Sequence, residues 1–247
     1  MKKVLIFGGT TEGREIAKII SEKGIFVVYS VATEYGKDVL NIKNNNFEVK
    51  TGRMTEDDIK EYLENNNFDF VVDATHPYAV DVSRNIKGAC NKTNNNYIRL
   101  LRQESPRANA IYVDSIEEAC LIADTGNVLA ATGSKEIKKY QSLKDYKTRL
   151  FARVLPSETS VNDCLNAGVP REHIIESFGA VSVDENMEVI KKYNIKTLIT
   201  KDGGKNGGFE EKCKAAENMG IKLICIKRPF EEKGYSIEEV TKYILGE

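Results

Sequence analysis

Short apolar runs alternate with amphipathic stretches along most of this chain. The first run, Val4–Phe7, is fully apolar, which is typical of a strand buried on both faces of a parallel sheet. The stretch that follows places Ile16, Ile19 and Ile20 on one helical face. Gly24 then suits the left-handed turn that commonly ends a helix. We expect a second strand over 25–31 and a short third strand that ends near 49–50. Further strands are expected over 68–72, 97–101, 127–131, 148–152, 173–176, 196–200 and 222–226.

Helical patterns fill the intervals between these runs. They are expected over 12–22, 55–64, 79–92, 115–124, 134–143, 158–167, 183–193, 208–219 and 236–245. This alternation, with short loops, indicates parallel strands joined by crossover helices. The segment 103–110 interrupts it, with five predicted strands on each side. The sequence therefore predicts an α/β fold with two Rossmann-like, doubly wound parallel-sheet domains. These are a dinucleotide-binding domain over 1–110 and a substrate-binding domain over 111–247.

A glycine-rich turn follows the first strand. Gly8 and Gly13 fill the first and third positions of the dinucleotide fingerprint G-x-G-x-x-G, whereas Thr10 occupies the middle one. Glycine permits the sharp turn, and Thr10 or Thr11 is suited to cap the next helix. Such a turn presents backbone N–H groups to an anion, usually a pyrophosphate. The incomplete match leaves an ordinary strand-to-helix turn as the alternative.

Unusual polar clusters lie directly after the predicted strands. In an open parallel sheet, ligands bind at this edge because the strand order reverses there and leaves a crevice. We expect the two domains to turn these edges toward a shared interdomain cleft. The clusters are Gly8–Thr11, Gly52-Arg53, Asp73–Tyr78, Thr132–Lys135, Arg153 and Thr200–Asn206.

Two loops of the second domain have the composition of anion-binding segments. Thr132–Lys135 combines a glycine turn with Ser134, which is suited to cap the next helix, and with the positive charge of Lys135. The segment Lys201–Gly208 contains four glycines and two lysines, which permit close backbone approach and supply charge. A mobile loop without a ligand is the alternative for the second segment.

Several other side chains are ambiguous from spacing alone. His76 precedes a proline, and a lone histidine is more often structural than catalytic. Arg99 and Arg102 fit either a packing or a surface position. Tyr140 and Lys144 have the Y-x-x-x-K spacing of short-chain dehydrogenases, in which one helical turn brings the lysine to the phenol. Because a strand follows within a few residues, we interpret this pair as an exposed helix face.

The amino-acid composition limits the kinds of molecule that this protein is expected to bind. The 36 basic and 37 acidic residues give a net charge of −1, so no global field recruits nucleic acid or an anionic membrane. No apolar run approaches the roughly 20 residues of a membrane helix, and the N-terminus does not resemble a signal peptide. The five cysteines lack a C-x-x-C pair, and no metal cluster is expected. We therefore expect a cytoplasmic protein with reduced thiols.

Taken together, these motifs resemble the precorrin-6A reductases (CobK/CbiJ) of cobalamin biosynthesis, along essentially the whole chain. The stretch Asp73–Ala79, which reads D-A-T-H-P-Y-A, is the most specific of them. The matching segments are Leu5–Arg14, Val72–Ala79, Thr132–Lys135, Ala152–Pro156, Thr200–Gly204 and Arg228-Pro229.

The resemblance implies transfer of a hydride from NADH or NADPH to a conjugated double bond of a tetrapyrrole, the corrin precursor precorrin-6A, with or without cobalt. The cofactor residues that it implies are Gly8, Gly9, Thr10, Thr11, Asp73, Ala74 and Thr75. The residues that it implies for the carboxylates of the substrate are Ser134, Lys135, Arg153, Lys201 and Lys205. By position, the candidates for the proton partner are His76, Tyr78 and Lys201, with solvent or the substrate's own nitrogens as alternatives.

One position departs from the family pattern. Members that use NADPH often have Gly-Arg after the second strand, whereas this chain reads Ala32-Thr33-Glu34-Tyr35. Glu34 lies 21 residues after Gly13, close to the place of the acid that binds a ribose 2′-hydroxyl, and it would repel a 2′-phosphate. This predicts a preference for NADH. The alternative functions are a short-chain-type dehydrogenase acting on a small alcohol and a non-catalytic dinucleotide sensor.

Overall fold

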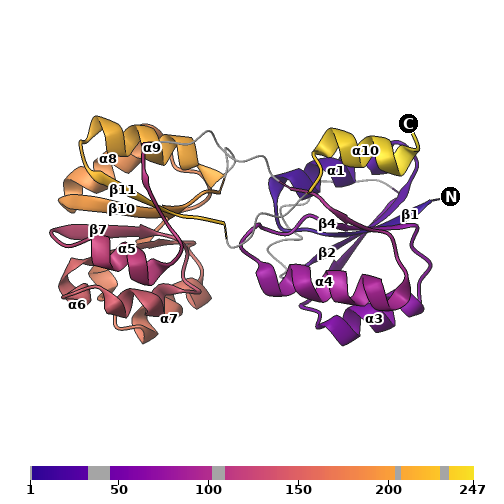
Figure 1. Ribbon diagram of the computed structural model, residues 1–247, viewed down its shortest axis with the longest axis horizontal. Coiled ribbons are helices and arrows are strands. Elements are labelled where there is room, and N and C mark those ends of the chain that lie inside the picture. Colours follow the sequence, from indigo (N-terminus) through magenta and orange to yellow (C-terminus); the bar gives the residue numbers. More distant parts are fainter. Residues whose placement is uncertain (1, 33–44, 102–108, 204–206, 229–233) are drawn as a thin grey trace. The chain divides into compact units, whose positions relative to one another are not determined.

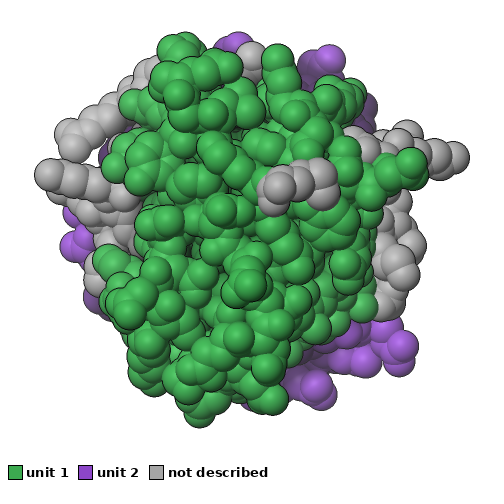
Figure 2. All heavy atoms as spheres, turned by 90° about the vertical axis from the view of Figure 1, so that its right-hand side faces the viewer, with its two compact units in different colours: residues 1–103, 230–247 green, residues 104–229 purple. Residues whose placement is uncertain are grey.

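The computed structural model describes residues 2–32, 45–101, 109–203, 207–228 and 234–247. The chain divides into two compact units (Figures 1 and 2). Unit 1 comprises residues 1–103 and 230–247, and unit 2 comprises residues 104–229. No helix in the described residues is long and apolar enough to cross a membrane.

Unit 1 contains a five-stranded sheet in the order β3-β2-β1-β4-β5, in which every pairing is parallel. Helices α1 and α10 cover one face and α3 and α4 the other (Figure 1). The strands are β1 (Lys3–Phe7), β2 (Phe26–Val31), β3 (Phe47–Thr51), β4 (Phe70–Asp73) and β5 (Tyr97–Arg99). The helices are α1 (Thr11–Glu22), α3 (Glu56–Glu64), α4 (Val80–Thr93) and α10 (Ile237–Leu245).

The strand order of unit 1 reverses between β1 and β4. The chain runs outward from β1 through β2 to β3, and then returns to pair β4 with the other side of β1. The last pair in this ladder is Phe7 with Asp73. The glycine turn after Phe7 and the segment after Asp73 therefore leave the sheet side by side, at the position where doubly wound sheets bind ligands.

The C-terminal segment belongs to unit 1, which differs from the expected division at residue 110. Tyr235 forms a parallel bridge with Leu100 beside β5, and α10 then packs on α1. The reason is hydrophobic burial, because Val240 and Ile244 are 0% exposed and lie in the same core cluster as Ile16 and Ile20. The amphipathic pattern predicted the helix but not the sheet that it covers.

Unit 2 contains a six-stranded sheet in the order β6-β11-β10-β7-β8-β9, again with only parallel pairings. Helices α8 and α9 cover one face, and α5, η1 and α7 cover the other (Figure 1). The strands are β6 (Ile111–Val113), β7 (Asn127–Ala131), β8 (Leu150–Val154), β9 (Ile174–Glu176), β10 (Ile195–Lys201) and β11 (Lys222–Ile226). The helices are α5 (Ile116–Ile122), η1 (Ile137–Ser142), α6 (Tyr146–Arg149), α7 (Glu158–Asn166), η2 (Arg171–His173), α8 (Val183–Lys192) and α9 (Phe209–Asn218).

The predicted fold class is confirmed, with three local corrections in unit 2. The edge strand β6 is a sixth strand that the sequence pattern missed. In place of a helix over 134–143 there is a 3₁₀ helix, η1, followed by the single-turn helix α6. Tyr140 is 0% exposed, and its hydroxyl is 3.1 Å from Thr132 Oγ1. The interpretation of Tyr140 as part of an exposed face is therefore wrong, although Lys144 is exposed.

We expect Ile244→Ala to lower the free energy of unfolding by about 2–4 kcal/mol, because it leaves a cavity between α10 and α1. The measurement is urea denaturation of the full chain. Glu238→Ala on the exposed side of α10 is the matched control. It removes an exposed ion pair with Lys242 and should cost less than about 1 kcal/mol. Equal effects would contradict the assignment of α10 to the core of unit 1.

Candidate cofactor and substrate sites

The β1–α1 turn has the backbone geometry of an anion-binding loop. Gly9 has a φ of +127°, which favours glycine, and no heavy atom lies within 4 Å of the position that a Cβ would take there. Thr10 caps α1 by accepting a hydrogen bond from Gly13 N at 3.1 Å. The first turn of α1 follows directly, and its N–H groups have no acceptors within the helix. The predicted cap by Thr10 is confirmed.

Gly8 and Gly13 are required for packing around Tyr29. A Cβ on Gly8 would stand 2.1 Å from Tyr29 Cζ, and a Cβ on Gly13 would stand 3.0 Å from both the Tyr29 hydroxyl oxygen and Ala74 Cβ. Burial raises the pKa of Tyr29 to about 12, so its hydroxyl stays neutral. The two outer glycines therefore bring helix and sheet together, while Gly9 between them keeps the turn open. A nucleotide pyrophosphate fits this arrangement.

Asp73 organises the segment beside this turn. Its carboxylate is 0% exposed and accepts hydrogen bonds from Thr75 N at 3.0 Å, Thr75 Oγ1 at 2.7 Å and Tyr97 Oη at 3.1 Å. Thr10 Oγ1 donates to Ala74 O at 2.9 Å, which ties the glycine turn to the same segment. Because internal donors surround it, the Asp73 carboxylate fixes the course of the backbone from Asp73 to Thr75.

Arg99 is the buried counter-ion of Asp73. Arg99 is only 4% exposed, and its Nη1 lies 2.9 Å from Asp73 Oδ1. The same nitrogen donates to the carbonyl oxygens of Asp73 and Thr75 at 3.0 and 3.1 Å. The sequence left Arg99 open between packing and surface. Its partner is not predictable from spacing, because the pairing depends on β5 lying next to β4.

His76 and Tyr78 lie together just beyond this network. Their ring centroids are 5.6 Å apart, and Tyr78 N donates to His76 Nδ1 at 3.3 Å. His76 is exposed and Tyr78 is half-buried. Both side chains therefore stand at the carboxyl edge of the first sheet, next to the glycine turn, as the sequence predicts for groups near a bound cofactor.

The strand order of unit 2 reverses between β7 and β10, where Ala131 pairs with Thr200. This brings together the two loops that the sequence singled out. Lys201 forms an ion pair with Glu136, the residue that follows the exposed Lys135. Ser134 donates to Asp163 Oδ2 at 2.8 Å. The prediction that it caps the following helix is wrong, because η1 begins after Glu136 and has no side-chain cap.

Arg153 lies near the carboxyl end of β8 and contacts α8. Its Nη1 donates to Asn186 Oδ1 at 2.7 Å. Burial lowers the pKa of Arg153 to about 10, and Glu185 partly opposes this shift. Another cation, Lys212 on α9, was not predicted as a site residue. It is 7% exposed, and its Nζ donates to Gly207 O at 2.7 Å.

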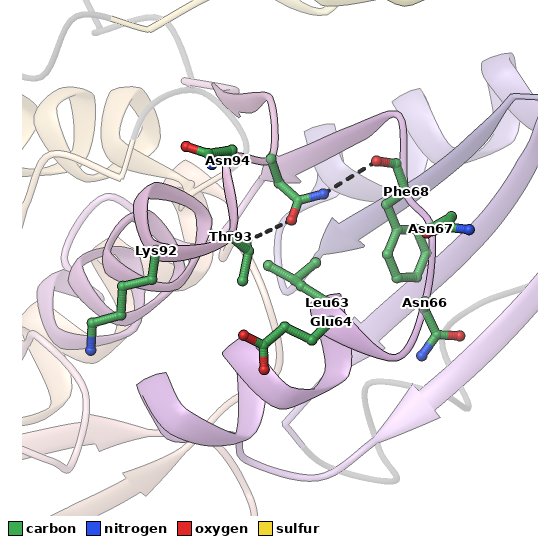
Figure 3. Close-up of a pocket in the computed structure, with 9 residues that line it drawn as sticks. Leu63, Glu64, Asn66, Asn67, Phe68, Lys92, Thr93 and Asn94 are labelled. Atoms are coloured by element: carbon green, nitrogen blue, oxygen red, sulfur yellow. Dashed lines mark hydrogen bonds between the residues drawn. The ribbon is translucent and has the colours of Figure 1, made fainter.

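Two predicted residues, Glu34 and Lys205, lie outside the described residues, as does Arg102. A polar cavity of about 380 Å³ opens beside the carboxyl ends of α3 and α4, and no predicted site residue lines it (Figure 3). Within the described residues, no group of three or more His, Cys, Asp or Glu side chains is arranged to hold a metal ion. The complete burial of Tyr140 also counts against the short-chain dehydrogenase alternative.

The two parallel sheets and the glycine turn at a reversal of strand order define a Rossmann-like α/β protein. A solved structure titled CobK precorrin-6A reductase shares this fold, with a TM-score of 0.77 over 100% of this chain and 97% of that chain, at 21% identity. The family model for precorrin-6x reductase CbiJ/CobK matches residues 3–245. The chain therefore belongs to the precorrin-6x reductase family.

Three curated relatives agree with this assignment along nearly their full length. The cobalt-precorrin-6A reductase of Methanocaldococcus jannaschii is 34% identical, with 98% of both chains covered. The cobalt-precorrin-6A reductase of Priestia megaterium is 31% identical, with 99% of this chain and 98% of the relative covered. The precorrin-6A reductase of Mycobacterium tuberculosis is 28% identical, with 100% and 98% covered.

We expect Arg99→Met to lower the free energy of unfolding by about 3–5 kcal/mol, because it leaves the Asp73 carboxylate buried without its cation. Urea denaturation measures this change. Arg84→Met is the matched control, since Arg84 pairs with Asp81 at the surface and should contribute less than about 1 kcal/mol. If both variants unfold at the same urea concentration, the Arg99–Asp73 pair does not hold the edge of the sheet.

Proposed function

We propose that this chain reduces precorrin-6A, in its cobalt-containing form, by transferring a hydride from a nicotinamide cofactor to one conjugated double bond of the macrocycle. The observation that carries this proposal is the family match over residues 3–245. The glycine turn of unit 1 supports it independently, because it suits a dinucleotide. The relatives from Methanocaldococcus jannaschii and Priestia megaterium are both named cobalt-precorrin-6A reductase.

The proposed cofactor site lies at the β1–β4 reversal of unit 1. Gly8, Gly9, Thr10 and Thr11 would hold the pyrophosphate through backbone N–H groups at the N-terminus of α1. The Thr10 hydroxyl takes part in this site only indirectly, because it already bonds Gly13 N and Ala74 O. The segment Asp73–Thr75 would line the nicotinamide side, with the Asp73 carboxylate holding its backbone in place.

The nicotinamide supplies the hydride when it is bound, and the protein contributes placement and electrostatics. His76 and Tyr78 stand beside the proposed nicotinamide position and can hold a proton for the reduced macrocycle. Lys201 is the third candidate, and its ion pair with Glu136 keeps its ammonium group at the edge of the second sheet. No covalent intermediate with the protein is needed for this reaction.

The proposed substrate residues lie in unit 2. The macrocycle carries several acetate and propionate arms, and a nearly neutral protein must bind them through local cations. Lys135, Arg153 and Lys205 supply such charges, and Ser134 lies in the same loop as Lys135. We further propose that the enzyme acts in the cytoplasm.

The direct test is anaerobic incubation of the full chain with cobalt-precorrin-6A and either NADH or NADPH, with the nicotinamide absorbance recorded. We expect oxidation of the nicotinamide that depends on the macrocycle, and a lower KM for NADH because Glu34 would repel a 2′-phosphate. Absence of macrocycle-dependent oxidation with both cofactors would overturn the proposed function. A clear preference for NADPH would overturn only the assignment of Glu34.

We expect His76→Ala to lower kcat by at least about tenfold, in line with the contribution of a positioned proton donor. The dissociation constant for NADH, measured by its fluorescence, should change little. His173→Ala provides a control, because His173 stacks on Phe151 with ring centroids 4.1 Å apart and should affect stability rather than turnover. An unchanged kcat for His76→Ala would remove His76 from the catalytic candidates.

A further inference from the structure

Two cations, the half-buried Arg153 and the buried Lys212, lie at the carboxyl edge of the second sheet. Arg153 is the second-last residue of β8. Lys212 lies on the first half of α9, and its side chain runs back along the helix so that Nζ reaches Gly207 O at 2.7 Å. Lys212 Nζ lies beside Gly208, which packs against Ala180, and Arg153 reaches Asn186, whose amide donates to the carbonyl of the residue after Ala180, Val181. The two groups therefore share one polar environment rather than two separate ones.

Close contacts join the backbone segments around Arg153 and Lys212, which are the start of α9 and the residues just before α8. Gly208, at the start of α9, has a φ of +64°, and a Cβ there would stand 3.1 Å from Ala180 Cβ, just before α8. The same position is 3.6 Å from Lys212 Nζ. On α8, Asn186 is fully buried, and its amide donates to the carbonyl oxygens of Val181 and Ser182 at 3.1 and 2.7 Å. These bonds direct its oxygen at Arg153.

Both cations have neutral hydrogen-bond partners instead of counter-ions. Arg153 donates to the Asn186 amide and Lys212 to a backbone carbonyl. Among the described residues, neither side chain forms an ion pair with a carboxylate. Glu185 is held by its own capping box with Ser182. Glu211, beside Lys212 on α9, reduces the positive field without contacting the ammonium group.

This arrangement is costly for a protein to maintain. Burial, and next the charge of Arg153, lower the pKa of Lys212 to about 8. A buried charge is normally paired because desolvation of a lone ion is unfavourable, and the positive charge of Arg153 adds repulsion at Lys212. An anion placed between them would relieve both effects at once, and a carboxylate offers two oxygens that can accept from both donors.

We propose that Arg153 and Lys212 together bind one carboxylate of the tetrapyrrole substrate, with Asn186 as the positioning residue for the guanidinium group. This inference rests on the proposed function and adds to it a specific residue, Lys212, that no motif indicated. It predicts that the site contributes to binding of the macrocycle and not to binding of the nicotinamide cofactor.

The test compares Lys212→Met with Lys214→Met, a control that removes an exposed lysine from the same helix. We expect the KM for cobalt-precorrin-6A to rise about 10- to 100-fold in Lys212→Met, the loss typical of a hydrogen bond to a charged group, and to stay unchanged in the control. The KM for NADH should be the same in both. The melting temperature of Lys212→Met should not fall, because the variant removes a buried charge.

An equal KM for the macrocycle in both variants would overturn the inference. A second measurement separates it from the proposed function: equilibrium binding of uroporphyrin, a tetrapyrrole rimmed by acetate and propionate arms, followed by fluorescence anisotropy without turnover. Weaker binding to Lys212→Met than to the control supports the carboxylate site even if no reduction is observed. Equal binding, or no binding to the unaltered protein, counts against it. Lys212→Gln provides a second neutral variant if Lys212→Met does not fold.

Discussion

Parallel strand pairing is the constraint on which the rest of this structure depends. Because every ladder in both sheets is parallel, all strands of a sheet end at one edge, and the polar segments that follow them are forced together there. The strand order adds the second requirement. It reverses between β1 and β4 in unit 1 and between β7 and β10 in unit 2, which places two non-consecutive loops side by side in each.

The charged residues at the carboxyl edges of the two sheets have different kinds of partner. In unit 1, Asp73 and Arg99 neutralise each other and saturate the surrounding donors, which produces a rigid segment suited to lie against a cofactor. In unit 2, the half-buried Arg153 and the buried Lys212 donate hydrogen bonds to neutral partners. A site that is satisfied internally holds its shape, whereas a site with surplus charge gains free energy when an anion arrives. Under the proposed function, this difference suits the first edge to orienting a cofactor and the second edge to binding an acidic substrate.

Much of this fold was predictable because the spacing of apolar residues indicates which face of each helix or strand is buried. The strands, most helices and the Thr10 cap follow from local pattern. The features that were predicted wrongly or missed are those that depend on tertiary contacts. The three-residue strand β6 is too short to show an alternating hydrophobic pattern. The pattern places Tyr140 at the surface, although its side chain is 0% exposed and its hydroxyl lies 3.1 Å from Thr132 Oγ1. Arg99 and Lys212 are typical surface residues by composition, and only the neighbouring strands and helices bury them.

The central claim is that the glycine turn after β1 and the segment after β4 form the nicotinamide site. Hydrogen exchange of the full chain, with and without saturating NADH, tests it most directly because it requires neither substrate nor turnover. The account predicts slower exchange of backbone amides in residues 8–13 and 74–79 when NADH is bound. Protection confined to other segments, such as the cavity lined by Leu63 and Phe68 (Figure 3), would contradict it.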